Sequence, residues 1–327
     1  MRTTFMAPSA RSAFLIFVIG CAVACAADAA TAAVSHTAAV SRAALNSPLL
    51  ELAASQDTSS LPNAEAVRRN LQAAEHLLAN AKPPSEDCLQ SLGADRYADL
   101  YAQAGEARAS LGNYAGAEQA YRAAFDCQPR NFFHAYLLGE ALLAQMQFDN
   151  ARAVVGNALS QEPKHYDLNS LQMRLDVVVE NWPGVAEHAN FLIQSERRKE
   201  QTPYWHIFQR LAAQRLHAAL KPNPKNVLSD WPGPVLQYLD GAIPEKELAR
   251  VIARESRDAR RREMLCEALF YVGEQQLALG NRERARVLFA TAVQSKILDF
   301  IEYQLARAEL QKMRAAAESI TVARPLR

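Results

Sequence analysis

The chain has little of what interrupts helices. Only 12 of its 327 residues are glycine, whereas half are hydrophobic and alanine is abundant. This composition suits an all-helical protein, because glycine is costly inside helices and alanine is the best helix former. The formal net charge of +1 gives no overall attraction to nucleic acid or to a membrane surface.

Catalytic signatures are also missing. The sequence contains no HExxH, G-x-S-x-G, P-loop or Cys-x-x-Cys motif. Its seven histidines are scattered, and we expect His134 and His165 to be surface or half-buried side chains and not metal ligands. We therefore expect no enzymatic activity and no cofactor.

No long hydrophobic run follows the first residues, and the N-terminus is typical of an export signal. Arg2 and Arg11 accompany a short apolar core at 13–20, which cannot span a membrane. Val18-Ile19-Gly20-Cys21 resembles the lipobox of bacterial lipoproteins. It predicts an export signal at 1–21, a lipid on Cys21 and, since no aspartate follows it, an outer-membrane location facing the periplasm. Alternatively, cleavage near Ala29 would leave a soluble periplasmic protein.

Residues 22–61 are rich in alanine, serine and threonine. They predict a flexible tether, transiently helical around 42–54, with a mean reach of roughly 35 Å.

A repeat of 34 residues organises the rest of the chain. In residues 98–131, small residues and tyrosines fall at the spacing of a tetratricopeptide repeat, a helix–turn–helix unit. Gly105 lies where the two helices cross, Gly112 lies in the turn, and Pro129 ends the second helix. The pattern recurs at 132–165, with Gly139 at the crossing, and at 266–299. Three copies in the same register predict an all-α, right-handed superhelix.

The solenoid should run from 62 to 314 as about six helix pairs, with a frayed tail at 315–327. Between the strong repeats the pattern degenerates. Trp182-Pro183-Gly184 and Trp231-Pro232-Gly233-Pro234 are expected to form turns, and 300–314 a final helix.

Cysteine usage leaves two interpretations. An oxidising envelope permits a bridge between Cys88 and Cys127. The interpretation that we favour is that Cys88, Cys127 and Cys266 are all small packed side chains.

A repeat scaffold functions as a binding surface, and the first helix of each repeat should line its concave groove. The residue after the packing glycine points there, and it is Glu106, Glu140 or Glu274. Beside them we place Asp99, Ala102, Phe133, Tyr136, Asp167, Arg174 and Phe270. These residues predict an acidic groove with aromatic anchors, suited to a basic or amphipathic segment. Alternatively, the glutamates only solvate helix surfaces, since glutamate is a good helix former.

The basic run at 254–263, RESRDARRRE, is interleaved with acids and lacks aromatic partners. We interpret it as a solvated face of a single helix and expect no nucleic-acid binding.

The C-terminal half resembles the new-lipoprotein-I (NlpI) family. The resemblance covers 90–312 loosely and 231–310 better, where it rests on Tyr238–Ile243, on Phe270–Gly273 and on Phe300–Tyr303. It implies an envelope adaptor that presents peptidoglycan hydrolases to a periplasmic protease, and it leaves homodimerisation open. An alternative role is that of a pilotin-like assembly factor for an outer-membrane secretion or pilus machine.

Overall fold

The computed structural model describes residues 47–56, 64–80, 94–195, 197–219, 222–223, 228–298 and 300–322. Within these ranges the chain is helical and contains no strand. The α-helices are α4 (Pro48–Ala54), α5 (Ala64–Asn80), α6 (Ala94–Ser110), α7 (Tyr114–Cys127), α8 (Phe132–Ala144), α9 (Phe148–Gln161), α10 (Tyr166–Val178), α11 (Trp182–Gln194), α12 (Thr202–Leu216), α13 (Gly233–Leu239), α14 (Glu245–Ala253), α15 (Asp258–Ala278), α16 (Arg282–Gln294) and α17 (Ile301–Val322).

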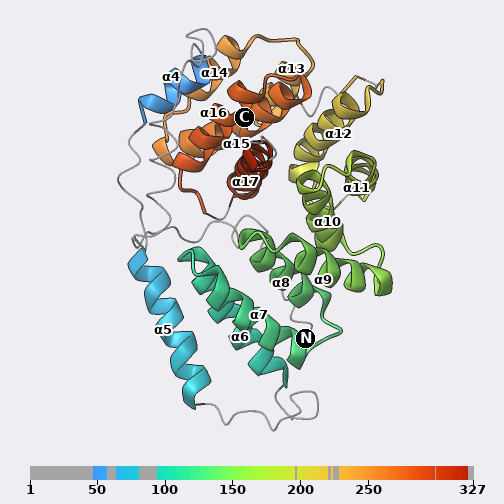
Figure 1. Ribbon diagram of the computed structural model, residues 1–327. Coiled ribbons are helices and arrows are strands. Elements are labelled where there is room, and N and C mark those ends of the chain that lie inside the picture. Colours follow the sequence, from blue (N-terminus) through green and yellow to red (C-terminus); the bar gives the residue numbers. More distant parts are fainter. Residues whose placement is uncertain are drawn as a thin grey trace, which may run out of the picture.

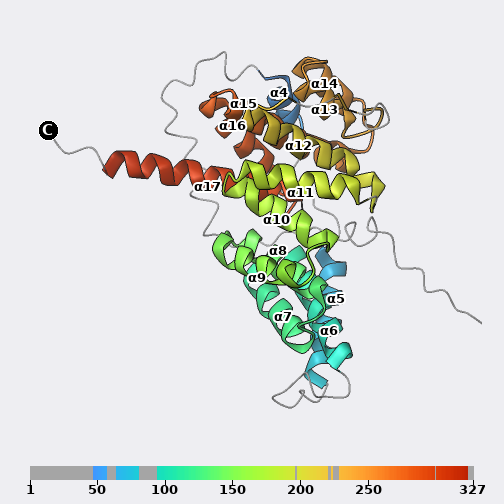
Figure 2. The ribbon, with the colours of Figure 1, turned by 90° about the vertical axis from the view of Figure 1, so that its right-hand side faces the viewer.

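Helices that follow one another in the sequence pack against one another from α5 to α12 and again from α15 to α17. This arrangement confirms the predicted all-α repeat solenoid. Figure 1 shows α5, α6 and α7 at one end of the molecule and α13, α14 and α4 at the other, and Figure 2 shows the same separation from a second side. We call these ends the N-terminal pole and the α14 pole.

The packing glycines lie where the sequence places them. A Cβ atom on Gly105 would lie 2.4 Å from the ring of Tyr121, and one on Gly273 would lie 2.5 Å from the ring of Phe289. Each ring belongs to the second helix of the same repeat. Only a residue without a side chain lets the helices approach this closely.

The turn inside each repeat requires a left-handed backbone at its fifteenth position. Gly112 and Gly280 have φ values of 76° and 78° there. In the second repeat Met146 takes the same conformation, with φ of 61°, and Glu180 does so in the degenerate third, with φ of 59°. The third repeat therefore keeps the turn at 180–181. The predicted Trp182-Pro183-Gly184 turn is wrong, since these residues form the first turn of α11 and Asn181 caps it.

The second Trp-Pro-Gly sequence is a turn in its first half, since Trp231 and Pro232 form a turn as predicted and α13 begins at Gly233. The basic run is divided, because α14 ends at Ala253 and α15 begins at Asp258. The expectation that this run occupies one helix is therefore wrong.

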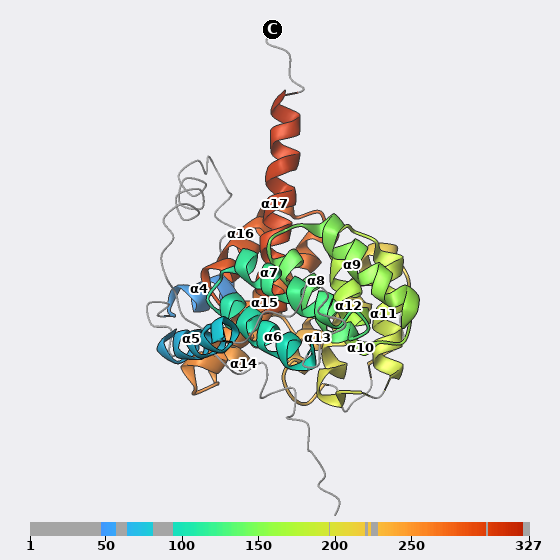
Figure 3. The ribbon, with the colours of Figure 1, turned by 90° about the horizontal axis from the view of Figure 1, so that it is seen from below.

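The final helix is longer than predicted. α17 continues to Val322, and the alanine-rich sequence after Met313 explains the extension through its high helix propensity. Arg314, Ala315 and Glu318 are exposed, and Figures 2 and 3 show this end of α17 projecting from the body. The first half of α17 instead packs on α10, α15 and α16.

Part of the predicted tether is a packed helix. α4 lies against α14, α15 and α16, and its Leu49 is fully buried there. Pro48 occupies the first turn, where a proline costs no hydrogen bond. The tether prediction is therefore wrong for residues 47–56. Cys21 and the segment before residue 47 lie outside the described residues.

Cys127, at the end of α7, is disulfide-bonded. The interpretation of Cys127 as a packed thiol is therefore wrong, and its partner lies outside the described residues. Cys266 is a buried thiol outside any disulfide, as expected, and its Sγ donates to the Ala292 carbonyl oxygen at 3.7 Å.

Candidate partner-binding surface

The first helices of the two N-terminal repeats, α6 and α8, carry an exposed group of predicted site residues. Phe133, in the first turn of α8, is 42% exposed, and its ring stacks on that of Tyr136 with 5.8 Å between centroids. Asp99 and Glu106 on α6 are exposed, and Ala102 lies between them, half-buried. We call these five residues the open surface.

Two neighbours link the open surface across the two helices. The Tyr121 hydroxyl has a raised pKa because it is buried, and the charges of Glu106 and Glu140 raise it further, which places both carboxylates near this ring. Burial by the surrounding helices also raises the pKa of Glu106, although the residue reaches solvent. His134 lies beneath the open surface, close enough to Asp99 for the charge of that carboxylate to act on its imidazole ring.

His134 is 2% exposed, which contradicts its predicted surface position. Burial lowers the pKa of His134, which favours the neutral form of the ring. His165 is half-buried as expected, and its Nδ1 accepts a hydrogen bond from the Leu168 backbone N–H at 3.3 Å as the cap of α10.

Further along the solenoid, the predicted site residues turn inward. Glu140 accepts two hydrogen bonds from Arg174, one of them 3.0 Å long from Nη1 to Oε2. Arg174 is 2% exposed and also donates from Nε to the Ser170 carbonyl oxygen. The prediction that Arg174 is available to a partner is therefore wrong. Asp167, which was also predicted to line the groove, forms an ion pair with Arg198 at 2.8 Å.

Phe270 and Glu274, on α15, are buried as well. Phe270 packs between the rings of Tyr271 and Phe289, with centroids 5.2 and 5.9 Å away. Glu274 is 1% exposed and pairs with Arg215 of α12 at 2.9 Å. Their predicted place on an accessible groove is wrong, because α17 and α12 cover this face of α15.

Where α15 packs on α17, carboxyl groups of one helix lie close to carboxyl groups of the other. On α15, Glu267 and Glu274 are seven residues apart, and on α17 so are Glu302 and Glu309. Mainly through burial, and also through the charge of Glu302, the pKa of Glu267 is raised to about 8. Mainly through burial, and also through the charge of Glu274, the pKa of Glu309 is raised to about 8. The Tyr271 hydroxyl donates to Glu302 at 2.5 Å.

Sequence reasoning missed this closed face. The available signal was the spacing of Glu302 and Glu309 among apolar neighbours in the final helix, which would place both on one buried side.

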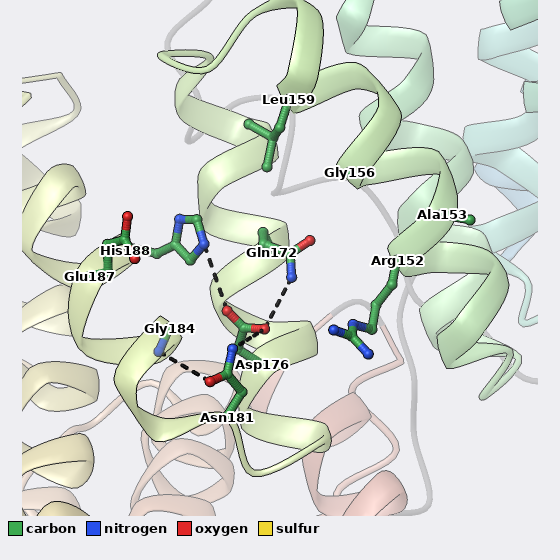
Figure 4. A pocket seen from close by; sticks show the side chains of 10 residues that line it. All are labelled: Arg152, Ala153, Gly156, Leu159, Gln172, Asp176, Asn181, Gly184, Glu187 and His188. Carbon is green, nitrogen blue, oxygen red and sulfur yellow. Dashed lines mark hydrogen bonds and ion pairs between the residues drawn. The ribbon is translucent and has the colours of Figure 1, made fainter.

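A polar pocket of 510 Å³ lies where α9, α10 and α11 meet. Figure 4 shows Asp176 at its base, where the carboxylate accepts hydrogen bonds from Gln172 and Asn181 at 3.0 and 3.2 Å and lies 3.7 Å from Nε2 of His188. The polar groups of these side chains therefore pair with one another. Their arrangement joins α10 to α11, and Gly184 makes room for the Asp176 carboxylate.

No group of three His, Cys, Asp or Glu side chains that could hold a metal ion occurs within the described ranges. Among the helices described, none is both long enough and apolar enough to cross a membrane.

Comparison with known proteins shows a similarity in sequence. No protein-family model matches the chain. The chain is similar to a protein named "Lipoprotein NlpI homolog" from Haemophilus influenzae, with 26% identity over 223 residues. The alignment covers 66% of this chain and 70% of that protein. This similarity agrees with the family resemblance of the C-terminal half and with the all-helical repeat fold.

Proposed function

We propose that this protein is a non-catalytic binding scaffold of the bacterial cell envelope, held at a membrane by a lipid on Cys21. The observation that carries the proposal is the open surface on an α-solenoid. It presents a stacked aromatic pair, Phe133 and Tyr136, beside the exposed carboxylates of Asp99 and Glu106. The similarity to a protein named as a lipoprotein supports the placement in the envelope.

The chemistry of the open surface selects the kind of partner. An exposed aromatic ring offers an anchor for an apolar side chain, and the two carboxylates favour a segment with basic residues. Glu140 contributes less to this attraction, because its charge is paired with Arg174. An amphipathic or extended basic segment of another protein therefore fits best. On the family resemblance, cell-wall hydrolases and an envelope protease are the partners to test first.

Replacing Phe133 with alanine should weaken partner binding. Truncating an exposed aromatic anchor typically costs about 1–3 kcal/mol, which is roughly a 5- to 150-fold rise in Kd. Partners are first retrieved from envelope extracts with the full processed chain, and Kd is then measured for each of them.

The matched control is Leu279→Ala, which removes a 65% exposed side chain at the far end of α15. Both variants should keep the wild-type melting temperature, since neither side chain is in the core. If the folded Phe133→Ala variant retrieves the same proteins with unchanged Kd, the open surface is not the binding site.

Replacing Cys21 with alanine should release the protein from membranes into the soluble envelope fraction, because the lipid-bearing thiol is lost. Membrane and soluble fractions are compared by immunoblot, and intact-mass measurement of the wild-type protein reads the N-terminal residue. A wild-type chain that begins at Ala30 without lipid would disprove the anchor and favour soluble export.

A further inference from the structure

We infer that the α14 pole is the surface that faces an anionic lipid membrane, and that α4 enforces this orientation and directs the open surface away from it. The inference rests on the proposed lipid anchor and adds which part of the molecule that anchor holds near the membrane.

α4 fixes the point at which the chain leaves the folded body. Leu49 is fully buried in the core, and α4 packs on α14, α15 and α16. The Ser47 hydroxyl donates to Glu245 at the start of α14, and Arg284 of α16 pairs with the same carboxylate. The described part of the chain therefore begins at residue 47, docked at the α14 pole, although the repeats begin at the opposite pole (Figure 1).

This attachment shortens the effective tether. Between Cys21 and Ser47 lie residues 22–46, whose alanine-, serine- and threonine-rich sequence predicts a flexible tether. A tether of that length has a mean reach of roughly 28 Å. The α14 pole must stay within about that reach of the membrane. Without the docking of α4, the tether would extend to α5 and the body could turn freely.

The charges at the two poles agree with this orientation. Residues 245–263 contain seven arginines and lysines against five aspartates and glutamates. Most of these pair with one another, but Lys246 and Arg254, at the two ends of α14, make no ion pair with any described residue. Arg282, at the start of α16, makes none either.

At the other pole, residues 94–127 contain five aspartates and glutamates against three arginines, and two of these carboxylates, Asp99 and Glu106 on α6, belong to the open surface. Anionic head groups attract exposed arginines and lysines and repel carboxylates, so the field of the membrane favours the same orientation as the short tether.

The test measures how close each pole lies to a lipid bilayer. A hexahistidine tag replaces residues 1–21 and binds vesicles of phosphatidylcholine that contain a nickel-chelating lipid, so the test does not depend on lipidation. A fluorescent non-natural amino acid stands at Ser256, exposed beside α14, or at Gln103, exposed on α6. Energy transfer to an acceptor dye on the lipid head groups is then measured for each.

Transfer from position 256 should be about twofold more efficient than from position 103, given the short reach of the tether. Adding phosphatidylglycerol should widen the difference. Leu49→Asp should release α4 and abolish it, whereas Leu77→Asp, at a 44% exposed position on α5, should leave it unchanged. If Leu49→Asp unfolds the chain, replacement of residues 47–56 by a glycine–serine segment of equal length serves instead.

Equal or reversed efficiencies in the otherwise unchanged chain would overturn the inference, as would a difference that survives the release of α4 on vesicles without phosphatidylglycerol. Neither result would affect partner retrieval through Phe133, so failure here is distinguishable from failure of the proposed binding function.

Discussion

Replacing Gly139 with leucine should lower the free energy of unfolding by roughly 1–3 kcal/mol or more, because it overpacks the centre of the solenoid. A Cβ atom at this position would already lie 2.7 Å from Cδ2 of Leu171 and 2.9 Å from Cγ2 of Val155. Both neighbours are fully buried, so neither can move aside into solvent. Thermal and urea unfolding of the two proteins measure the difference.

Gly156, in the middle of α9, provides the matched control. No atom lies within 4 Å of a Cβ placed there, so Gly156→Ala should stabilise the protein by up to about 1 kcal/mol through helix propensity. The damage from Gly139→Leu should be greatest in the repeats next to it, since each repeat contacts mainly its neighbours. Hydrogen exchange along the chain can locate it. An unchanged melting temperature for Gly139→Leu would show that α8 does not cross its neighbours at Gly139.

Replacing Glu309 with glutamine should stabilise the protein at alkaline pH and weaken its pH dependence. Glu309 is 3% exposed, and three carboxylates in this region, Glu180, Glu274 and Glu309, share two cations, Arg215 and Lys312. One carboxyl group is therefore best kept neutral. Burial and the charge of Glu274 accordingly raise the pKa of Glu309 to about 8.

The direction of the pH effect follows from this raised pKa. An unfolded glutamate loses its proton near pH 4.5, whereas folded Glu309 keeps it until about pH 8. Between these values the folded state binds more protons than the unfolded state, so stability falls as pH rises. The stability that this bound proton contributes is fully present below about pH 4.5 and is lost by the time the pH passes about 8.

We therefore expect the wild-type free energy of unfolding to fall between about pH 5 and pH 9 and the Glu309→Gln variant to lose less, with a gain of roughly 1–3 kcal/mol at pH 9. Urea unfolding at several pH values measures both. Glu318→Gln, exposed on the projecting end of α17, is the control and should follow the wild-type curve. A Glu309→Gln curve parallel to that of the wild type would mean that Glu309 is already ionised in the folded protein.

The sequence alone determined the local features of the repeats. Gly105, Gly139 and Gly273 mark the helix crossings, and Gly112 and Gly280 mark the turns. Each acts on residues close by in the chain, so spacing is enough to predict it. The failure at Trp182 has a local cause too, since Glu180 adopts the left-handed conformation without being a glycine, and the turn lacked its usual signal.

Only the tertiary structure decided which residues a partner can reach. Glu106, Glu140 and Glu274 occupy the same position of three repeats, yet the first is exposed, the second is paired with Arg174 and the third is buried beneath α17. Their exposure depends on which of them α17 and the other distant helices cover. In the same way, only the structure shows that α4 packs at the α14 pole, whereas the repeats that follow it begin at the opposite pole. These contacts join residues on different helices, from 34 positions apart for Glu140 and Arg174 to 198 positions apart for Ser47 and Glu245, and no periodicity within one helix records them.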